Sequence, residues 1–307
     1  MTPKVTICVP VYNSASTIEK ALTSAMQQSY GDFECLVIDN ASTDSTFERA
    51  IAFGDSRIRV LRNTVNVGVV ANENRCIREA TGELIQFLHG DDWLLPDCLS
   101  RLVPTFEDPG VGLAFARRRI ESEDPKWAAL IGTLHTPLEP LGNINAGMEI
   151  VRKYVRGGSR GNWIGEPTSV MVRRSLLAAV GGFDPRQRSY SDMELWLRVL
   201  ARSNAAWVDE ELSVRVQHDA SLSAQYEETD ESWLDRPWIL AGLAHDPHLD
   251  PDIRSKAWRQ WIIAVAKKLV RTQLATGAVR RARYRELGSH VRQSLVWDNS
   301  WCPLNVA

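Results

Sequence analysis

The chain has 307 residues, of which 44% are hydrophobic and 24% charged, and its formal net charge is −2, values that are ordinary for a globular protein. The small net charge argues against a dedicated nucleic-acid-binding protein, and the five dispersed cysteines, without a CxxC pair, argue against a disulfide or zinc framework. Met1 leads directly into strand-like sequence, and no uncharged apolar stretch approaches the ~20 residues of a membrane span, so we expect a cytoplasmic protein without a signal peptide.

The first 120 residues alternate between apolar, strand-like runs and helical segments. Each of the first four runs is followed by a segment with helical spacing or a helix-start signal. This alternation predicts right-handed βαβ units and a mainly parallel sheet flanked by helices, an α/β fold of Rossmann-like type. The five strands are expected at residues 5–11, 33–38, 58–61, 84–88 and 111–120.

The regular alternation ends after residue 120. Residues 121–145 contain few periodic apolar positions and predict a long loop, a feature that is often functional in a compact domain. A glycine-rich run follows at residues 157–161. Helices are expected at residues 146–156, 173–180 and 191–201, and short strands at 167–172, 206–208 and 212–216.

The last part of the chain is strongly basic. Between Arg254 and Arg292 there are eleven Lys or Arg residues and one acid, and apolar residues follow helical spacing on either side of Gly277. Two amphipathic helices are therefore predicted. They pack on the domain through their apolar stripes, or they attach the protein to the anionic inner face of a membrane. Both interpretations are kept at this point.

Two adjacent acids, Asp91 and Asp92, follow the fourth predicted strand directly. Ligands of open α/β sheets bind beyond the carboxyl ends of the strands. Two carboxylates side by side are costly there unless a positive charge is shared between them. A hard divalent cation that carries a phosphate is the usual partner, so these acids predict a metal–diphosphate site.

Other polar residues follow neighbouring strands, namely Tyr12 and Asn13, Asp39 and Asn40, and Asn66. If the strands are parallel neighbours, these groups meet at one edge of the sheet, where a carboxylate can accept from a base N–H or a ribose hydroxyl. The sequence contains neither GxGxxG nor GxxxxGK[ST], the motifs that grip phosphates with backbone N–H groups. The phosphate must then be held by a metal or by basic side chains.

Two further residues allow a structural and a chemical interpretation each. Asp192, next to Ser191 at the start of a predicted helix, is either part of a helix N-cap or a general base for an acceptor hydroxyl. His218 follows a predicted strand, and it is either a solvated side chain or a metal ligand, for which imidazole suits Mn²⁺ better than Mg²⁺.

Taken together, these motifs resemble family 2 glycosyltransferases of the GT-A fold. The resemblance covers roughly residues 3–223, and it rests on the order and spacing of the motifs because each of them alone is weak. The motifs are VPVYN at 9–13, ECLVIDNASTD at 34–44, NVG at 66–68, Asn74, the segments 82–92, 167–174, 181–183 and 192–198, and His218.

The resemblance implies an inverting hexosyltransferase that uses a UDP- or dTDP-linked sugar donor and a divalent metal, Mn²⁺ or Mg²⁺. The acceptor would be a hydroxyl of a carbohydrate or lipid-linked saccharide, as in the synthesis of a cell-surface polysaccharide or glycolipid. The implied layout is a GT-A domain over residues 1–225, with a nucleotide-sugar half (1–120) and an acceptor half (121–225), followed by a helical, basic extension (226–307).

The resemblance also implies roles for individual residues. Asp192 would be the catalytic base, and Asp92 would bind the metal together with His218. The acceptor would contact Trp163 and Glu166, with Trp127 and residues 157–161 nearby, although a purely structural Trp163 is an equal alternative. The nucleotide-sugar would be contacted by Pro10, Tyr12, Asn13, Asp39, Asn66 and Asp91.

Four positions depart from the pattern of the family. His89 and Asn40 stand where acids are common, Ser191 stands where a Glu often precedes the base, and Glu73 stands where an Arg is often found. The first three leave the mechanism intact but bear on the metal and the acceptor contacts. The last weakens any assignment of diphosphate contacts to the helix that contains Glu73.

Two other functions are compatible with an α/β sheet that has acids at its edge. A sugar-phosphate nucleotidyltransferase normally carries a Gly-rich, basic loop after the first strand, whereas residues 12–16 here contain no basic residue. A non-catalytic binding module with the same fold is the other alternative. The presence of Asp39, Asp92 and Asp192 together argues against that loss of activity.

Overall fold

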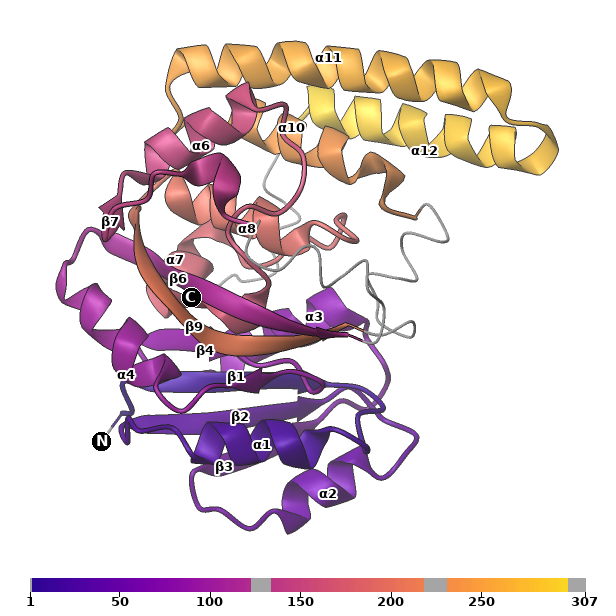
Figure 1. The fold of residues 1–307 in the computed structure, drawn as a ribbon. Coiled ribbons are helices and arrows are strands. Elements are labelled where there is room, and N and C mark those ends of the chain that lie inside the picture. Colours follow the sequence, from indigo (N-terminus) through magenta and orange to yellow (C-terminus); the bar gives the residue numbers. More distant parts are fainter. Residues whose placement is uncertain (1, 123–133, 218–230, 298–307) are drawn as a thin grey trace.

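The computed structural model describes residues 2–122, 134–217 and 231–297. These residues form one nine-stranded mixed sheet in the order β3-β2-β1-β4-β8-β6-β9-β5, with β7 paired to β9 (Figure 1). The strands are β1 Val5–Val11, β2 Phe33–Asp39, β3 Ile58–Arg62, β4 Leu84–Phe87, β5 Trp93–Leu94, β6 Val111–Ser122, β7 Ile144–Asn145, β8 Val170–Arg173 and β9 Asn204–Gln217. The helices are α1 Ile18–Met26, α2 Thr46–Ala52, α3 Val69–Glu79, α4 Cys98–Leu102, α6 Gly147–Arg156, α7 Arg174–Val180, α8 Ser191–Leu200, α10 Asp235–His245, α11 Pro251–Leu274 and α12 Gly277–Leu295.

The prediction of a mainly parallel sheet flanked by helices is confirmed. Strands β3, β2, β1 and β4 are parallel neighbours, and β6 is parallel to β9. The short strand β8 is antiparallel to both β4 and β6, and it joins the two parallel parts. The helical C-terminal region is present as well.

The structure differs from the predicted elements in several places. The two strands expected at 206–208 and 212–216 form one long strand, β9. The register of β9 against β6 shifts between Ala116 and Arg117, and this irregularity accommodates the polar residues that separate the two predicted strands. Residues Pro167–Ser169 form a 3₁₀ turn, so β8 begins only at Val170. Helix α4 is short and continues as a 3₁₀ helix over Val103–Glu107. Helix α10 was not predicted.

Two buried clusters of apolar side chains cover the two faces of the sheet. Strand β1 contributes side chains to both clusters: Cys8 belongs to one cluster, and its neighbours Ile7 and Val9 belong to the other. Strands that are buried on both faces read as continuous apolar runs, which explains why the central strands could be predicted. The cysteines at 8, 35, 76 and 98 are buried and free.

The C-terminal helices pack on the domain. Ile253, Ala257 and Trp261 of α11 belong to the same apolar cluster as Trp196 of α8, and Leu287 of α12 is buried. In Figure 1, α11 and α12 lie side by side and extend beyond the sheet. The two predicted helices are present and are separated just before Gly277, but they are only weakly amphipathic, since apolar residues such as Ile262 and Leu269 of α11 are exposed. In the described part of the chain, none of the helices combines the length and the apolar character that crossing a membrane requires.

Candidate active site

The parallel register brings the predicted strand ends to one edge of the sheet. Val11 at the end of β1 is level with Asp39 at the end of β2, which is level with Arg62 at the end of β3. The polar residues that follow β1, β2 and β4 therefore share this edge. Pro10 is buried, whereas the side chain of Tyr12 is 45% exposed and presents an aromatic ring at the edge.

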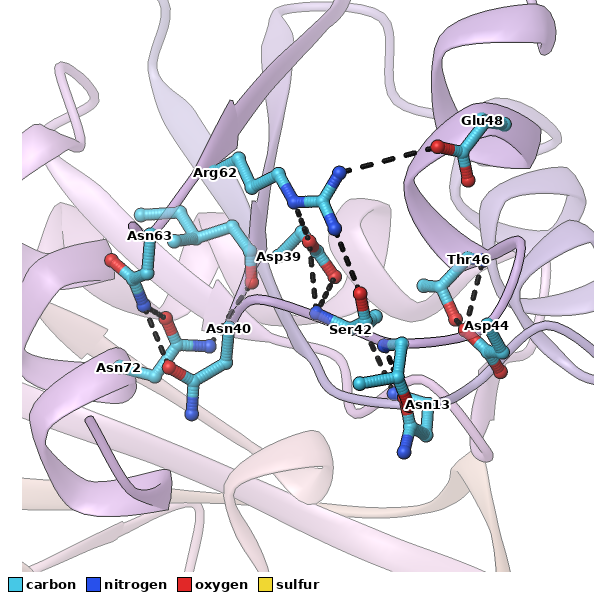
Figure 2. A network of polar contacts seen from close by, with 12 residues as sticks. Asn13, Asp39, Asn40, Ser42, Asp44, Thr46, Glu48, Arg62, Asn63 and Asn72 are labelled. Atoms are coloured by element: carbon cyan, nitrogen blue, oxygen red, sulfur yellow. Dashed lines mark hydrogen bonds and ion pairs between the residues drawn. The ribbon is translucent and has the colours of Figure 1, made fainter. Parts of the chain in front are cut away.

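Asp39 is fully buried and forms an ion pair with Arg62 (Figure 2). The Nε atom of Arg62 lies 3.0 Å from the Oδ2 atom of Asp39, and the backbone N–H of Ser42 donates to the same carboxylate. Arg62 also donates to the carbonyl oxygen of Ser42 at 2.7 Å. The carboxylate is thus fixed in position by a partner that the sequence analysis missed.

An asparagine network holds the neighbouring loops together (Figure 2). The Oδ1 atom of Asn40 accepts from Asn63 at 2.8 Å and from the backbone N–H of Val67 at 3.0 Å. Its Nδ2 atom donates to the Oδ1 atom of Asn66 at 3.0 Å, and Asn63 donates further to Asn72. The side-chain oxygen of Asn66 is therefore used within the protein, where it fixes the turn that starts α3.

Asn13 has a comparable role on the other side of Asp39. It adopts a left-handed conformation (φ 51°), and its Oδ1 atom accepts from the backbone N–H of Thr43 at 2.9 Å. Its own N–H donates to the Oγ atom of Ser42 at 2.9 Å. Asn13 and Asn66 lie at the predicted edge, but both side chains hold loops in place.

Asp92 is a buried carboxylate at the end of β4, with 4% of the residue exposed. Thr168 donates its hydroxyl to the Oδ2 atom at 2.7 Å, and the N–H of Val216 in β9 donates to the Oδ1 atom at 3.0 Å. Burial, followed by the charge of the adjacent Asp91, raises the pKa of Asp92 to about 6. The like-charge pair that the sequence predicted is therefore present, and it disfavours ionisation of Asp92.

Two of the departures from the family pattern contact each other. The Nε2 atom of His89 lies 3.1 Å from the Oε1 atom of Glu73, a buried residue of α3. Burial lowers the pKa of His89, but the carboxylates of Glu73, Asp92 and Asp91 outweigh this effect and raise it to about 9. An imidazolium and a carboxylate thus occupy the positions where the family pattern has an acid and an arginine.

Asp192 lies in the first turn of α8 and is half-buried. Its Oδ2 atom accepts from the Nδ2 atom of Asn162 at 2.7 Å, and its Oδ1 atom accepts from the N–H of Met193 at 2.6 Å. Burial above all, with a contribution from the charge of Glu166, raises the pKa of Asp192 to about 7. The N-cap interpretation is wrong, because the N-cap residue of α8 is Tyr190 and no side chain in the described part of the molecule caps this helix.

Glu166 is held between two arginines. The Nε atom of Arg118 lies 2.5 Å from one oxygen of Glu166, and Arg215 donates to the other. Burial raises the pKa of Glu166, but the two guanidinium groups outweigh it and lower the pKa to about 2. The carboxylate that was predicted to bind an acceptor is thus the centre of an ion-pair network.

Arg215 is a mostly buried charged residue of the candidate site that the sequence analysis did not single out. Its pKa is lowered by burial but raised overall by the charges of Glu166, Asp92 and Asp192. The guanidinium therefore lies within electrostatic reach of both the donor-side acid and the candidate base. The sequence contains one feature that could have drawn attention to Arg215: it is a charged residue between two valines, Val214 and Val216, in a predicted strand that leads to His218.

Of the remaining residues that were predicted to contact the acceptor, the structure describes Trp163 but not Trp127. Trp163 is half-buried, packs edge-to-face on Tyr154 with ring centroids 5.0 Å apart, and accepts with its carbonyl oxygen from the ring of His135. These contacts favour the structural interpretation of Trp163. Trp127 and His218 lie outside the described residues.

The chemistry of the edge fits a divalent cation, although the ligand set is not complete. Within the described ranges, no cluster of three or more His, Cys, Asp and Glu side chains can hold a metal ion. Asp91 and Asp92 provide oxygen ligands of the kind that Mg²⁺ and Mn²⁺ prefer. Burial and, after it, the charge of Asp91 raise the pKa of Asp92, and a bound cation would favour the ionised form of this carboxyl.

The sequence model of the family described as "Glycosyl transferase family 2" matches residues 6–177. The chain belongs to glycosyltransferase family 2. This family 2 glycosyltransferase is 40% identical over 302 residues to an uncharacterized protein, MT1568, of Mycobacterium tuberculosis (strain CDC 1551 / Oshkosh), and the match covers 95% of this chain and 94% of that protein.

Solved structures share the GT-A fold of this family 2 glycosyltransferase. S. aureus TarS 1-349 in complex with UDP-GlcNAc matches with a TM-score of 0.68 at 15% identity, over 95% of this chain and 81% of TarS. The mannosyltransferase PcManGT from Pyrobaculum calidifontis, in complex with GDP-Man and Mn²⁺, matches with a TM-score of 0.59 at 19% identity, over 99% and 85% of the two chains. At these identities the likeness shows the fold.

The ion-pair network around Glu166 generates a prediction about stability. Glu166→Gln leaves two mostly buried arginines without their carboxylate, and we expect a loss of about 3 kcal/mol or more in the free energy of unfolding. Urea denaturation measures it. Because folding lowers the pKa of Glu166 from 4.5 to about 2, its contribution should persist above pH 4.5 and disappear as the pH falls toward 2.

The matched control is Glu211→Gln. Glu211 pairs with Arg119 on the same two strands, β6 and β9, but both side chains are 40% or more exposed. An exposed pair contributes under about 1 kcal/mol. If the two variants lose the same small amount of stability, Glu166 is not the structural centre described above.

Proposed function

We propose that this family 2 glycosyltransferase is an inverting enzyme that transfers a hexosyl group from a nucleotide-diphosphate donor to an acceptor hydroxyl, with Asp192 as the general base. The observation that carries the proposal is that neighbouring residues of β9 contact both groups of acids: Val216 donates its N–H to Asp92, while Arg215 binds Glu166 and its guanidinium also interacts with the charge of Asp192. It supports a site in which a donor-side acid and a base with a pKa of about 7 act on one substrate pair. A saccharide or lipid-linked saccharide of the cell surface is the proposed acceptor class.

On the donor side, Pro10, Tyr12 and Asp39 would surround the base. The exposed ring of Tyr12 can stack on it, and Asp39 can accept from a base N–H with the lone pairs that Arg62 and Ser42 leave unused. Asn13 and Asn66 would contribute by shaping the loops. The UDP-GlcNAc complex of TarS supports a UDP-linked or a chemically similar dTDP-linked donor.

The proposed metal is Mn²⁺ or Mg²⁺, held by Asp92 with Asp91 as a further oxygen ligand or as the contact of the ribose. His218 would be the third protein ligand. When bound, the cation would neutralise charge on the diphosphate leaving group. The structure of PcManGT is a complex with Mn²⁺, which supports the use of such an ion by a protein of this fold.

Asp192 would remove the proton of the acceptor hydroxyl. The hydroxyl oxygen forms the new bond to the anomeric carbon, the bond from that carbon to the diphosphate oxygen breaks, and its electron pair leaves with the nucleoside diphosphate. Asn162 fixes one carboxylate oxygen, and each oxygen of Asp192 keeps a lone pair for the proton. A pKa of about 7 matches the operating range of a general base.

The alternative of a nucleotidyltransferase is disfavoured by the turn between β1 and α1. The N–H groups of Asn13, Ser14 and Ala15 each donate to a side chain of the loop after β2, at 2.9, 2.7 and 3.1 Å respectively. These groups are therefore occupied and do not offer a cradle for a triphosphate. The alternative of a non-catalytic module is decided by the measurements below.

Asp192→Asn keeps the size of the side chain but removes the base, so kcat should fall by ~10²-fold or more while donor affinity stays unchanged. For the wild-type enzyme, kcat should rise with pH through about 7, because the raised pKa leaves Asp192 protonated below that value. Steady-state kinetics over pH 5.5–8.5 and calorimetric titration of the donor provide both measurements. A variant as active as the wild type would exclude Asp192 as the base.

Asp92→Ala should abolish the metal-dependent part of nucleotide binding. The measurement is calorimetric titration of UDP, dTDP and GDP with Mn²⁺, with Mg²⁺ and with a chelator. Asp92→Asn is the companion variant, since its amide oxygen can still accept from the N–H of Val216 while its NH2 group donates to the hydroxyl oxygen of Thr168, and it should lower metal-dependent affinity with less effect on folding. If both variants bind nucleotide with undiminished metal dependence, Asp92 is not a metal ligand. If the wild-type protein binds no nucleotide, the non-catalytic module is favoured.

We also propose that α11 contacts an anionic membrane surface peripherally, within the basic region 254–292. Its outward side exposes a cluster of apolar residues, which we call the α11 apolar surface: Ile262, Ile263, Ala266, Val270 and Leu274. Ile262, Val270 and Leu274 are at least half exposed, and basic residues such as Arg259 and Lys267 lie beside them. Exposed apolar side chains among Lys and Arg are typical of helices that lie in the interface of an anionic bilayer.

The double substitution Ile263→Ser and Val270→Ser should weaken sedimentation with phosphatidylglycerol vesicles by about tenfold or more, since each buried apolar side chain is worth about 1.5–3 kcal/mol. Ile51→Ser, on the exposed side of α2, is the matched control. Unchanged vesicle binding would refute the contact. Loss of a dimer in the variant, without vesicle binding by the wild type, would assign the surface to a second copy of the chain.

A further inference from the structure

Two loops flank the candidate base on either side. One is the glycine-rich run 157–161, which leads to Asn162, the residue that donates to Asp192. The other comprises residues 188–190, which lead into α8 and to Asp192 itself. Both loops are held by side chains of the C-terminal extension, which sequence analysis had separated from the acceptor half.

Asp235, the first residue of α10, holds the loop before α8. Its carboxylate accepts from three consecutive backbone N–H groups: those of Arg188 at 3.1 Å, Ser189 at 2.7 Å and Tyr190 at 3.2 Å. Only 1% of Asp235 is exposed, so water does not compete for these bonds. Hydrogen bonds from backbone N–H groups to a buried carboxylate are strong and directional. They fix the N-cap of α8, two residues before Asp192.

The glycine-rich run is held by α10 and α11. The Nε atom of Arg236 donates to the carbonyl oxygen of Gly158 at 3.0 Å, and the hydroxyl of Ser159 in the run donates to the Oε1 atom of Gln260 in α11 at 3.3 Å. Gly158 and Gly161 have φ values of +93° and +75°. A run with such backbone freedom needs external contacts to adopt one conformation.

From these contacts we infer that the C-terminal extension completes the acceptor side of the site, with Asp235 and Arg236 as positioning residues for Asp192. This inference rests on the proposed role of Asp192 as the base. Asp235 sets where the first turn of α8 begins, and Arg236 sets the run that presents Asn162 to the carboxylate. A base displaced by about 1 Å can lose ~10²-fold in rate, so these contacts outside the sheet should be visible in kcat.

The test is Asp235→Asn in the full-length protein. An amide keeps one acceptor but turns N–H donors toward the backbone N–H groups of 188–190, so the loop should lose its fixed position. We expect kcat to fall by about tenfold to 10²-fold while donor affinity and donor KM stay unchanged. We also expect faster hydrogen exchange of the amides of residues 188–192, and a shifted midpoint in the pH dependence of kcat.

The matched control is Asp252→Asn. Asp252 is an acid of the same extension, and it accepts from Arg152 at 2.8 Å on the exposed surface between α11 and α6. The same chemical change there should leave kcat and exchange at 188–192 unaltered. If Asp235→Asn does not fold, Arg236→Met tests the other loop, with faster exchange at 157–162 and a lower kcat as the expected results.

Wild-type kcat together with wild-type exchange at these loops would overturn the inference. Failure of the proposed function is distinguishable from this outcome. If Asp192→Asn is fully active, Asp192 is not the base, whereas the exchange rates at 188–192 still report whether Asp235 holds the loop. Faster exchange in Asp235→Asn with unchanged kcat would contradict the positioning role.

Discussion

The site depends on how negative charge is balanced at the carboxyl edge of the sheet, and Arg215 is central to that balance. Its guanidinium binds Glu166 and interacts with Asp92 and Asp192. Glu166, with two arginines, is held ionised, and its pKa is about 2. Asp92 and Asp192 lack such full compensation, and burial raises their pKa values to about 6 and about 7. The arrangement separates an acid that two arginines hold ionised from two acids whose ionisation is disfavoured by burial, and such perturbed pKa values are common at active sites.

The parts of the fold that are governed by local sequence could be predicted. The buried strands, the helices between them and the acids at the ends of β2 and β4 follow from runs of apolar residues and the polar residues that end them. The partners of those acids could not be predicted, because Asp39 meets Arg62 across β2 and β3, and Asp92 meets Val216 from β9, 124 positions away. The arginine partners of Glu166 could not be predicted for the same reason, since both come from strands that are distant in the sequence.

His89 and Glu73 illustrate how isolated departures from a family pattern gain meaning in three dimensions. In the sequence they are 16 residues apart and were treated as independent weaknesses of the assignment. In the structure they form one contact, so the acid and the arginine of the family pattern have both been replaced and the charges have changed places. The contact between His89 and Glu73 links α3 to the loop after β4 in this chain.

The asparagine network beside Asp39 has a further consequence for the way the enzyme responds to its surroundings. Amide side chains neither gain nor lose protons in the physiological range, so the contacts of Asn40 with Asn63 and Asn66 keep their strength at every pH that a cell experiences. The hydrogen bonds of the loops beside Asp39 should therefore not depend on pH. The carboxyl groups of Asp92 and Asp192, in contrast, have pKa values of about 6 and about 7 and titrate near neutral pH. A change in cellular pH should then act on the proposed metal site and the proposed base and leave the hydrogen bonds of the asparagine network unaltered.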